Sequence, residues 1–328
     1  VATFRSGEDE TNEGNLVTDQ SGKILRDNIW GSLEQDTFRR DFTINALYYC
    51  PISGKIEDHN SGIAHIQNKK IISIGDPMKR FSEDPVRSLR AIRFSNKLNF
   101  KIDKNVKDAI YKKGYLLENI SNARLFDEFC KIFLSGIAEK NFNKLVSFNL
   151  NKYLILTNPN GSEFSQNLIK EALINTDKRV KNDQSVTPGF LIAAMLWPEV
   201  LKRSRGDKEI NLRKFFRSMD QILRNQQKIT AIPRKFHSYI KDIWVLQLKL
   251  HSRIGKQPYK TSKHPRFRAA YDFLLIREKA SKCKSNLGDW WTKFQKNNSA
   301  SQKQQILNLK EVDSENSFKK FGFQEELI

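Results

Sequence analysis

The chain has 328 residues, which is more than one hydrophobic core usually supports, so its length favours two or more lobes. With 38% hydrophobic and 29% charged residues it can bury real cores, and no apolar run approaches the roughly 18 to 20 residues of a membrane span. Its three cysteines are far apart and lack metal-ligand spacing, so neither a disulfide framework nor a zinc site is supported, and a reducing cytoplasm fits best.

The formal net charge of +20 is concentrated in one region of the chain. Residues 1–150 hold 23 Lys and Arg against 20 Asp and Glu, whereas residues 201–300 hold 25 against 7. Such a concentration attracts polyanions, and nucleic acid is the commonest large polyanion in a cell. The composition therefore predicts a nucleic-acid partner, with a merely solvated basic surface as the alternative.

The first 35 or so residues are expected to form loops, because stretches such as "SGEDETNEGN" are polar and rich in turn residues. The chain starts at Val1 with neither an initiator Met nor a signal-peptide pattern. We interpret this start as that of a sequence entered inside a domain.

Short elements are predicted next. "YYCPISGKIEDHNSG" alternates apolar and polar residues around Ser53 and Gly54, which indicates a hairpin, and "KKIISIGDP" predicts a strand that ends at Gly75. From Asp84 the period becomes helical, with Asp84 or Ser82 as the expected N-cap and Pro85 in the first turn.

Helices are predicted for most of the remaining chain. The clearest is "NARLFDEFCKIFLSG", which has an apolar side and a glycine, Gly136, just past its end. Others are expected at "PGFLIAAMLWPEVL", "RKFFRSMDQILRNQQ", "KFHSYIKDIWVLQLKLHSRIG" and "HPRFRAAYDFLLIREKA". From about Ala300 the Gln-, Asn- and Lys-rich sequence is expected to be loosely ordered.

The stretch "RRDFTINALYY" is a candidate site for a charged ligand. Arg39 and Arg40 could hold phosphate oxygens through charge-assisted hydrogen bonds, and Asp41 could accept from a ribose hydroxyl or steer a metal-bound phosphate. Asn45 would lie on the side of Asp41 if the segment is helical. The alternative is a surface Arg–Asp pair that caps an element.

A second candidate group recurs at helical spacing. Arg87, Arg90 and Arg93 follow every three residues, with Glu83 and Asp84 at the expected helix start. The buried side of this helix is assigned to Leu89, Ile92 and Phe94. The acidic pair could bond a nucleobase edge beside an arginine, or could merely complement the helix dipole and cap the helix.

Other chemistry has little support. The sequence contains no Gly-rich phosphate loop, no HExxH and no GxSxG. In the basic region cations alternate with aromatic residues, which suits single-stranded RNA, because cations neutralise phosphates and exposed rings stack on unpaired bases. For Phe215, Trp244 and Phe273 a place in a helix core is the preferred interpretation.

Three motifs in order, "RRDFTINALYY", "IGDPMKRFSEDPVRSLRAIRF" and "ARLFDEFCKIFLSG", resemble the bacterial poly(A) polymerase and CCA-adding tRNA nucleotidyltransferase family of the polymerase-beta-like superfamily. The distal stretches "IWVLQLKLHSRIGK" and "WWTKFQ" look like the body and tail of the poly(A) polymerase I branch. The resemblance runs from Val1 to about Gln295.

The resemblance implies template-independent transfer of AMP from ATP to RNA 3′ ends, in mRNA processing and decay. Asp41 would be a catalytic or ribose-binding carboxylate, and Asp84 and Arg87 would face the adenine edge. Nucleotide-binding roles are implied for Arg39, Arg40, Asn45, Asp84, Arg87, Arg90 and Arg93, and structural roles in a helical neck for Glu83, Arg124 and Glu128.

The resemblance also implies Mg²⁺ as a cofactor. The family holds its two metal ions with a DxD element that precedes "VATFR", and this sequence contains no replacement for it. We therefore expect an N-terminally truncated polymerase that is inactive as written, because the transition state would lack the charge stabilisation of the metal ions.

The expected fold class is α+β: a remnant of a nucleotidyltransferase head with short strands, then a mostly α-helical neck, body and tail. The expected domains are residues 1–80, 81–150, 151–255 and 256–328. The expected partners are ATP, single-stranded RNA 3′ ends and RNA-decay machinery, with no membrane. The alternatives are a CCA-adding enzyme, a non-catalytic RNA-binding module and, third, a scaffold for other proteins.

Overall fold

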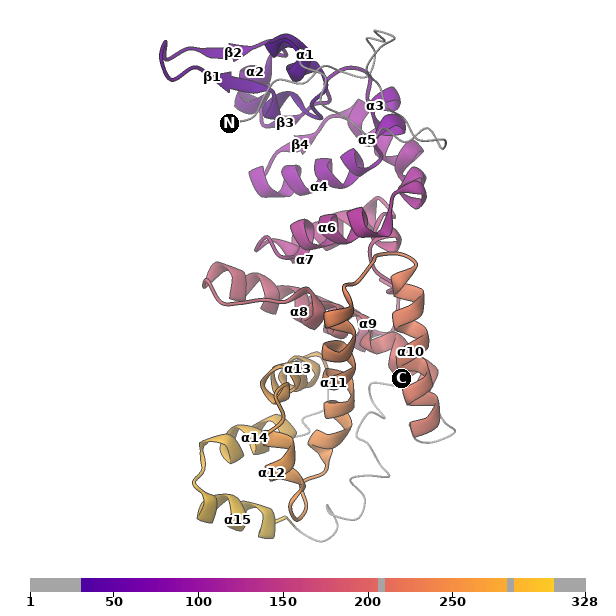
Figure 1. Cartoon of the computed structure of the whole chain (residues 1–328), viewed down its shortest axis with the longest axis vertical. Coiled ribbons are helices and arrows are strands. Elements are labelled where there is room, and N and C mark those ends of the chain that lie inside the picture. Colours follow the sequence, from indigo (N-terminus) through magenta and orange to yellow (C-terminus); the bar gives the residue numbers. More distant parts are fainter. Residues whose placement is uncertain (1–30, 206–209, 282–285, 310–328) are drawn as a thin grey trace. The chain divides into compact units, whose positions relative to one another are not determined.

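The computed structural model describes residues 31–205, 210–281 and 286–309 (Figure 1). The chain divides into two compact units, one that ends at Ile120 and one that begins at Ser121. In the described residues helices dominate and the strands are short, which confirms the predicted α+β class. No helix in these ranges has the length and apolar character needed to cross a membrane.

The first unit contains every strand of the described chain. Its elements are α1 (Leu33–Phe38), η1 (Thr43–Asn45), β1 (Leu47–Tyr49), β2 (Ile56–Asp58), α2 (Gly62–Gln67), β3 (Lys70–Ile71), α3 (Pro77–Glu83), α4 (Val86–Leu98), β4 (Lys101–Ile102), α5 (Lys104–Lys113) and η2 (Gly114–Asn119).

The predicted hairpin is confirmed. β1 pairs antiparallel with β2, with Leu47 opposite Asp58, and the turn contains Gly54 at a φ of +68° (Figure 1). β3 pairs in parallel with β4 and is only two residues long. The strand is shorter than predicted because the backbone after Ile71 leaves β4 and bonds to residues 41–43, with the N–H of Ile74 donating to the carbonyl of Asp41. Asp76 then starts α3, where its side chain accepts the N–H groups of Met78 and Lys79.

The predicted helix start near Asp84 is confirmed, and a second helix that the sequence did not predict ends just before it. α3 ends at Glu83 and α4 starts at Val86. Asp84 is extended because a residue before proline disfavours helical backbone, and Pro85 follows it. The expected N-cap Ser82 lies inside α3, and its hydroxyl donates to the carbonyl of Met78. Leu89 and Ile92 are fully buried as predicted.

The regular elements in the described residues of the second unit are all helices, apart from an isolated bridge between Arg205 and Ile210. Its elements are α6 (Asn122–Phe133), α7 (Ala138–Ser147), η3 (Asn151–Tyr153), α8 (Glu163–Lys181), α9 (Pro188–Ser204), α10 (Leu212–Gln227), α11 (Arg234–His251), α12 (Gln257–Ser262), α13 (Phe267–Ala280), α14 (Leu287–Lys296) and α15 (Ser299–Leu307). The predicted helices correspond to α6, α9, α10, α11 and α13, and α9 packs against α8, α10 and α11.

Aromatic side chains form much of the core of this unit. Phe215, Trp244 and Phe273 are fully buried, which confirms their predicted place. The indole of Trp244 donates to the carbonyl of Ala193, so the one polar atom of that ring is satisfied. Gly136 follows α6 at a φ of +79°, a backbone conformation that favours glycine.

Both ends of the chain were predicted to lack regular structure. The stretch from about Ala300 was expected to be loosely ordered, but α15 covers Ser299–Leu307, capped by the side chain of Asn298. The remainder, residues 310–328, lies outside the described residues, as do residues 1–30 of the predicted N-terminal loop. The division at residues 80, 150 and 255 stays a prediction; within the first unit, α3 packs against α5.

Candidate functional site

A pocket of about 440 Å³ in the first unit gathers the predicted site residues. We call it the RRD pocket, and it is lined by Arg39, Arg40, Asp41, Asn45, Asp84, Arg87, Arg90 and Phe94. Four arginines face two aspartates in this lining, so the pocket carries net positive charge. Segments about 40 residues apart in the sequence therefore meet at one place, as the two motifs suggested.

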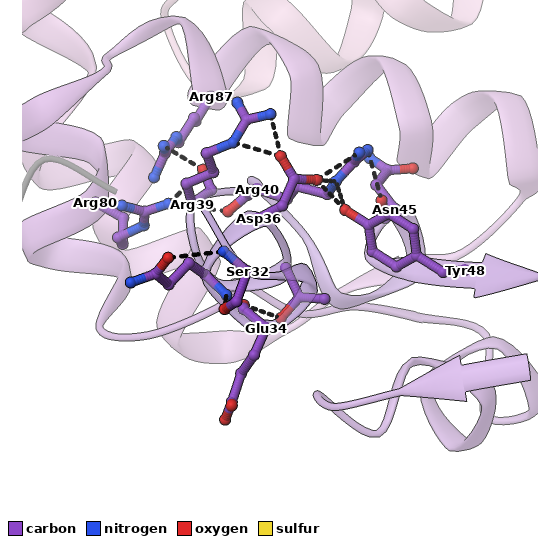
Figure 2. A network of polar contacts seen from close by, with 11 residues as sticks. Ser32, Glu34, Asp36, Arg39, Arg40, Asn45, Tyr48, Arg80 and Arg87 are labelled. Atoms are coloured by element: carbon purple, nitrogen blue, oxygen red, sulfur yellow. Dashed lines mark hydrogen bonds and ion pairs between the residues drawn. The ribbon is translucent and has the colours of Figure 1, made fainter. Parts of the chain in front are cut away.

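A buried carboxylate that the sequence reasoning missed holds the two leading arginines (Figure 2). Asp36 is 2% exposed. Its Oδ1 accepts from Arg39 Nε at 2.7 Å, and its Oδ2 accepts from Arg40 Nη2 at 2.9 Å and from the hydroxyl of Tyr48. Since Asp36 precedes the arginines by three and four residues, helical spacing was the signal that could have found it.

The segment around these arginines is fixed from two sides. α1 begins with a capping box in which Ser32 and Gln35 satisfy each other's backbone N–H groups. Past its end, Arg80 Nη2 donates to the carbonyls of Arg39 at 2.8 Å and Arg40 at 2.9 Å (Figure 2). A guanidinium at the C-terminal end of a helix is favoured by the helix dipole.

Asp41 is also buried, at 7% exposure, but it does not pair with its neighbouring arginines. Its Oδ1 accepts from the backbone N–H of Phe42 at 2.9 Å and from Asn45 Nδ2 at 3.0 Å. Its Oδ2 accepts from Arg90 Nε at 2.5 Å. The two sequence motifs are thus joined by an ion pair whose carboxylate is buried and whose arginine is 31% exposed, and Asn45 lies on the side of Asp41 as predicted.

Two of the three periodic arginines of α4 line the pocket. The guanidinium of Arg93 lies over the Phe94 ring at 4.7 Å, and that of Arg90 lies over the same ring at 5.2 Å. Phe94 was expected to be buried, but it is only half-buried, because its ring supports these guanidiniums while its edge meets Phe42.

Arg87 differs from the other arginines of the pocket. Its Nη2 makes a long hydrogen bond of 3.4 Å to the carbonyl of Arg39, and its Nη1 is buried without a hydrogen-bond partner among the described residues. Burial and the nearby charge of Arg80 lower the pKa of Arg87 below its ordinary value. A buried donor without an acceptor is costly, so a ligand acceptor that reached this nitrogen would stabilise it.

The pKa of Arg40 moves the other way. Burial disfavours its charged form, but hydrogen bonds to Asp36 and Tyr48 outweigh that effect and raise its pKa. Arg40 is thus held as a cation by protein groups, whereas Arg87 lacks this support.

The acidic side chains near α4 have defined partners. Asp84 lines the pocket, and its Oδ1 accepts the N–H of Val86 at 3.2 Å, so it also caps α4. Glu83 pairs with Arg80 at 2.9 Å. In α6 of the second unit Glu128 is buried and pairs with Lys131 at 2.8 Å, while Arg124 is exposed.

The pocket does not fit the pair of metal ions that the resemblance implies. In the part of the chain that the structure describes, no group of three or more His, Cys, Asp and Glu side chains could hold a metal ion. Asp41 already accepts three hydrogen bonds, and Asp84 is engaged at the start of α4. No catalytic step through Mg²⁺ is therefore derived from these residues.

Comparisons with known proteins agree with the motifs. A family profile described as "Poly A polymerase head domain" matches residues 1–72. A second, "Probable RNA and SrmB- binding site of polymerase A", matches residues 99–163, and a third, "Polymerase A arginine-rich C-terminus", matches residues 208–321.

Full-length relatives decide the family. Poly(A) polymerase I of Escherichia coli O157:H7 is 38% identical over an alignment of 328 positions, and the alignment covers 96% of this chain and 70% of that protein. The chain belongs to the poly(A) polymerase I family. The Salmonella typhi member is 38% identical over 309 residues, 90% of this chain and 66% of that protein, so the chain spans about two thirds of the length of these poly(A) polymerase I relatives.

More distant proteins share the fold or part of the sequence. A tRNA nucleotidyltransferase, solved in complex with a primer tRNA and an incoming ATP analog, has a TM-score of 0.57 at 18% identity and covers 82% of this chain and 75% of that one. A CCA-adding enzyme of Lactococcus lactis is 31% identical over 186 residues, 56% of this chain and 42% of that protein. Compared with the poly(A) polymerases, the sequence match to the CCA-adding enzyme covers much less of the chain.

Proposed function

We propose that this poly(A) polymerase I family member adds AMP from ATP to RNA 3′ ends without a template, and that the RRD pocket receives the ATP. The observation that carries the proposal is the buried Nη1 of Arg87, which has no partner among the described residues and belongs to a side chain that lines a positively charged pocket. A ligand with acceptor atoms and negative charge satisfies both features, and ATP has both.

The proposed roles follow from how each side chain is held. Arg39 and Arg40 would face the phosphates, because Asp36 fixes their guanidiniums and charge-assisted forks suit phosphate oxygens. Arg87 and Asp84 would meet the base edge. Asp41 would orient Arg90 and Asn45 and accept a ribose hydroxyl with its remaining lone pair.

The outer members of the site have supporting roles in this proposal. Arg93 would extend the basic flank of α4 through its stack on Phe94. In the first unit Glu83 would hold Arg80, and in the second Glu128 and Arg124 would stabilise α6. Mg²⁺ stays the expected cofactor, and single-stranded RNA in the cytoplasm the expected partner, with RNA-decay machinery as a further expected contact.

Equilibrium dialysis with ATP tests the pocket. Arg87→Gln should weaken ATP binding roughly tenfold or more, because a hydrogen bond to a charged group contributes about 1.5 to 3 kcal/mol. Lys97→Gln is the matched control, since it removes one positive charge from an exposed position of the same helix α4. Equal ATP affinities for the two variants would contradict the proposal.

A second assay separates poly(A) addition from CCA addition. The chain, joined to the DxD segment that the resemblance places before Val1, is incubated with ATP and an oligoadenylate in one reaction, and with CTP, ATP and tRNA that lacks its 3′ end in the other. We expect long A tails on the oligoadenylate, because matches to poly(A) polymerases cover more than nine-tenths of the chain. Ordered addition of C, C and A to the tRNA would support the alternative.

A further inference from the structure

A second arginine-lined pocket lies wholly within the second unit. We call it the Tyr239 pocket; it has a volume of about 320 Å³, within the size range of small-molecule sites. Its walls include Arg179 of α8, Phe190 of α9, Tyr239 of α11, and Arg266 and Arg268 at the start of α13. None of these residues belongs to the motifs of the RRD pocket.

One guanidinium of this pocket is held by an aromatic ring instead of a carboxylate. Arg266 is exposed and lies over the Tyr239 ring at 5.0 Å, and it forms no ion pair with any residue that the structure describes. The stack orders the guanidinium, so less side-chain entropy is lost when it binds a ligand. Its N–H groups and its outer face stay available.

The other arginines leave the pocket positive. Arg179 donates to the carbonyl of Ser185 at 3.2 and 3.1 Å and lies 3.7 Å from Asp272. Arg268 lies 3.1 Å from the same carboxylate and its side chain is 74% exposed. Two guanidiniums therefore share one carboxylate, and with Arg266 the pocket has three arginines against one aspartate.

The pocket also has an apolar wall in a fixed position. Phe190 is half-buried and packs edge-on against the core ring of Phe273. A Cβ on Gly189 would lie 2.9 Å from Phe236 and 3.0 Å from Tyr239, so glycine permits α9 to approach α11 closely. The spacing between Phe190 and the Tyr239–Arg266 stack is thus set by helix packing.

We propose that the Tyr239 pocket binds one nucleotide of a single-stranded RNA, with its base against the Arg266 stack and Phe190 and its phosphate on Arg266 and Arg268. Bases of single strands stack on aromatic rings and guanidinium planes, and arginines neutralise the phosphates. One side of the pocket, with Tyr239, Arg266 and Arg268, lies in residues 201–300, whose excess of cations attracts the strand. The inference rests on the proposed function only in taking RNA as the ligand.

The test measures RNA binding instead of catalysis. Fluorescence anisotropy follows a 5′-labelled 15-mer oligoadenylate as it binds to the whole chain. Arg266→Gln should weaken binding about tenfold, and Tyr239→Leu by a similar factor, because stacking of one base contributes roughly 1 to 3 kcal/mol. Arg266→Lys keeps the charge but loses the planar stack and should give an intermediate loss.

Arg217→Gln is the matched control, since it removes one exposed arginine of α10, in the same unit but outside the pocket. We expect less than a threefold change for it, and circular dichroism confirms that each variant is folded. Equal losses for Arg266→Gln and Arg217→Gln would overturn the pocket in favour of a diffuse basic surface. Competition by free AMP as strong as that of the oligomer would also overturn it, in favour of a mononucleotide site.

The outcomes also separate this inference from the proposed function. If the unaltered chain binds RNA and the pocket variants bind equally well, the pocket is wrong and AMP transfer is untouched. If the unaltered chain binds no RNA even at low salt, the RNA part of the proposed function fails as well.

Discussion

The RRD pocket and the Tyr239 pocket are both lined by arginines, but they hold them in different ways. In the RRD pocket two carboxylates that are less than 10% exposed, Asp36 and Asp41, fix three guanidiniums. In the Tyr239 pocket one half-buried carboxylate is shared, and Arg266 rests on a ring. Buried carboxylates with several hydrogen bonds define one geometry, whereas Arg268, which is 74% exposed, is less constrained. The first arrangement suits one small ligand, and the second suits successive nucleotides of a strand.

The largest expected effect comes from Asp36→Ala. Two arginines and Tyr48 lose their shared acceptor, but the arginines are 34% and 39% exposed and can be solvated by water, so we expect the loss typical of hydrogen bonds to a charged group, about 1.5 to 3 kcal/mol. The free energy of unfolding of the first unit should fall by about that amount, and ATP binding should be lost. Urea denaturation, followed by amide hydrogen exchange of residues 33–49, measures the change.

Glu34→Ala is the control for Asp36→Ala, because Glu34 is an exposed acid of the same helix (Figure 2). This variant should lower the free energy of unfolding of the first unit by less than about 1 kcal/mol, since only a helix-dipole interaction is lost. Equal losses of unfolding free energy for the two variants would mean that the buried Asp36 carboxylate does not fix the arginines of the RRD pocket. The contrast with the Tyr239 pocket would then be wrong.

Tyr48→Phe should have a smaller effect, about 1 kcal/mol, because it removes one hydroxyl that bonds Asp36 and Arg40. Burial and the hydrogen bond to Asp36 raise the pKa of Tyr48 above its ordinary value of 10.0. The folded state therefore keeps this proton longer than the unfolded state, so the contribution is full below pH 10 and is lost as the pH rises through the raised pKa.

Urea denaturation between pH 8 and pH 11 checks this sign for Tyr48. The stability difference between the unaltered chain and Tyr48→Phe should shrink as the pH rises. A difference that grows with pH would mean that the phenol is not held in its neutral form by Asp36.

The smallest expected effect belongs to Asp272→Asn. This carboxylate makes partly exposed ion pairs, which usually contribute less than about 1 kcal/mol, so the second unit should keep its stability. If the Tyr239 pocket binds RNA, affinity for the oligoadenylate should rise about threefold, because Arg179 and Arg268 are released for phosphates. Fluorescence anisotropy measures the affinity for the oligoadenylate. A fall in this affinity would show that Asp272 is needed to position Arg179 and Arg268.

The sequence predicted the residues that line the RRD pocket better than the residues that hold them in place. Asp41, Asn45, Asp84, Arg87 and Arg90 all line it, because two motifs with clear charge and periodicity supply them. Arg80 holds carbonyls about 40 residues away, and such a contact follows from packing that no local pattern displays.

Helices were predictable where an apolar stripe repeats, as in α6, and the start of α4 was predictable from Asp84 and Pro85. Helix α3 was not predicted, because only one of its seven residues, Phe81, is a buried apolar residue. The Tyr239 pocket is lined by residues of four helices. The basic and aromatic residues of its region predicted RNA binding, but their pattern in the sequence did not predict where on the protein the RNA would bind.

The contacts of Arg80 show that the arginines of this cluster have different roles. Arg80 and Asp36 hold the backbone and the side chains of the segment, while Arg87, which lines the pocket, makes only one long hydrogen bond to it. Exchanging Arg87 would thus alter what the pocket accepts while the surrounding turn keeps its shape. If the RRD pocket receives a nucleotide as proposed, such an arrangement would let nucleotide preference diverge during evolution without a new fold.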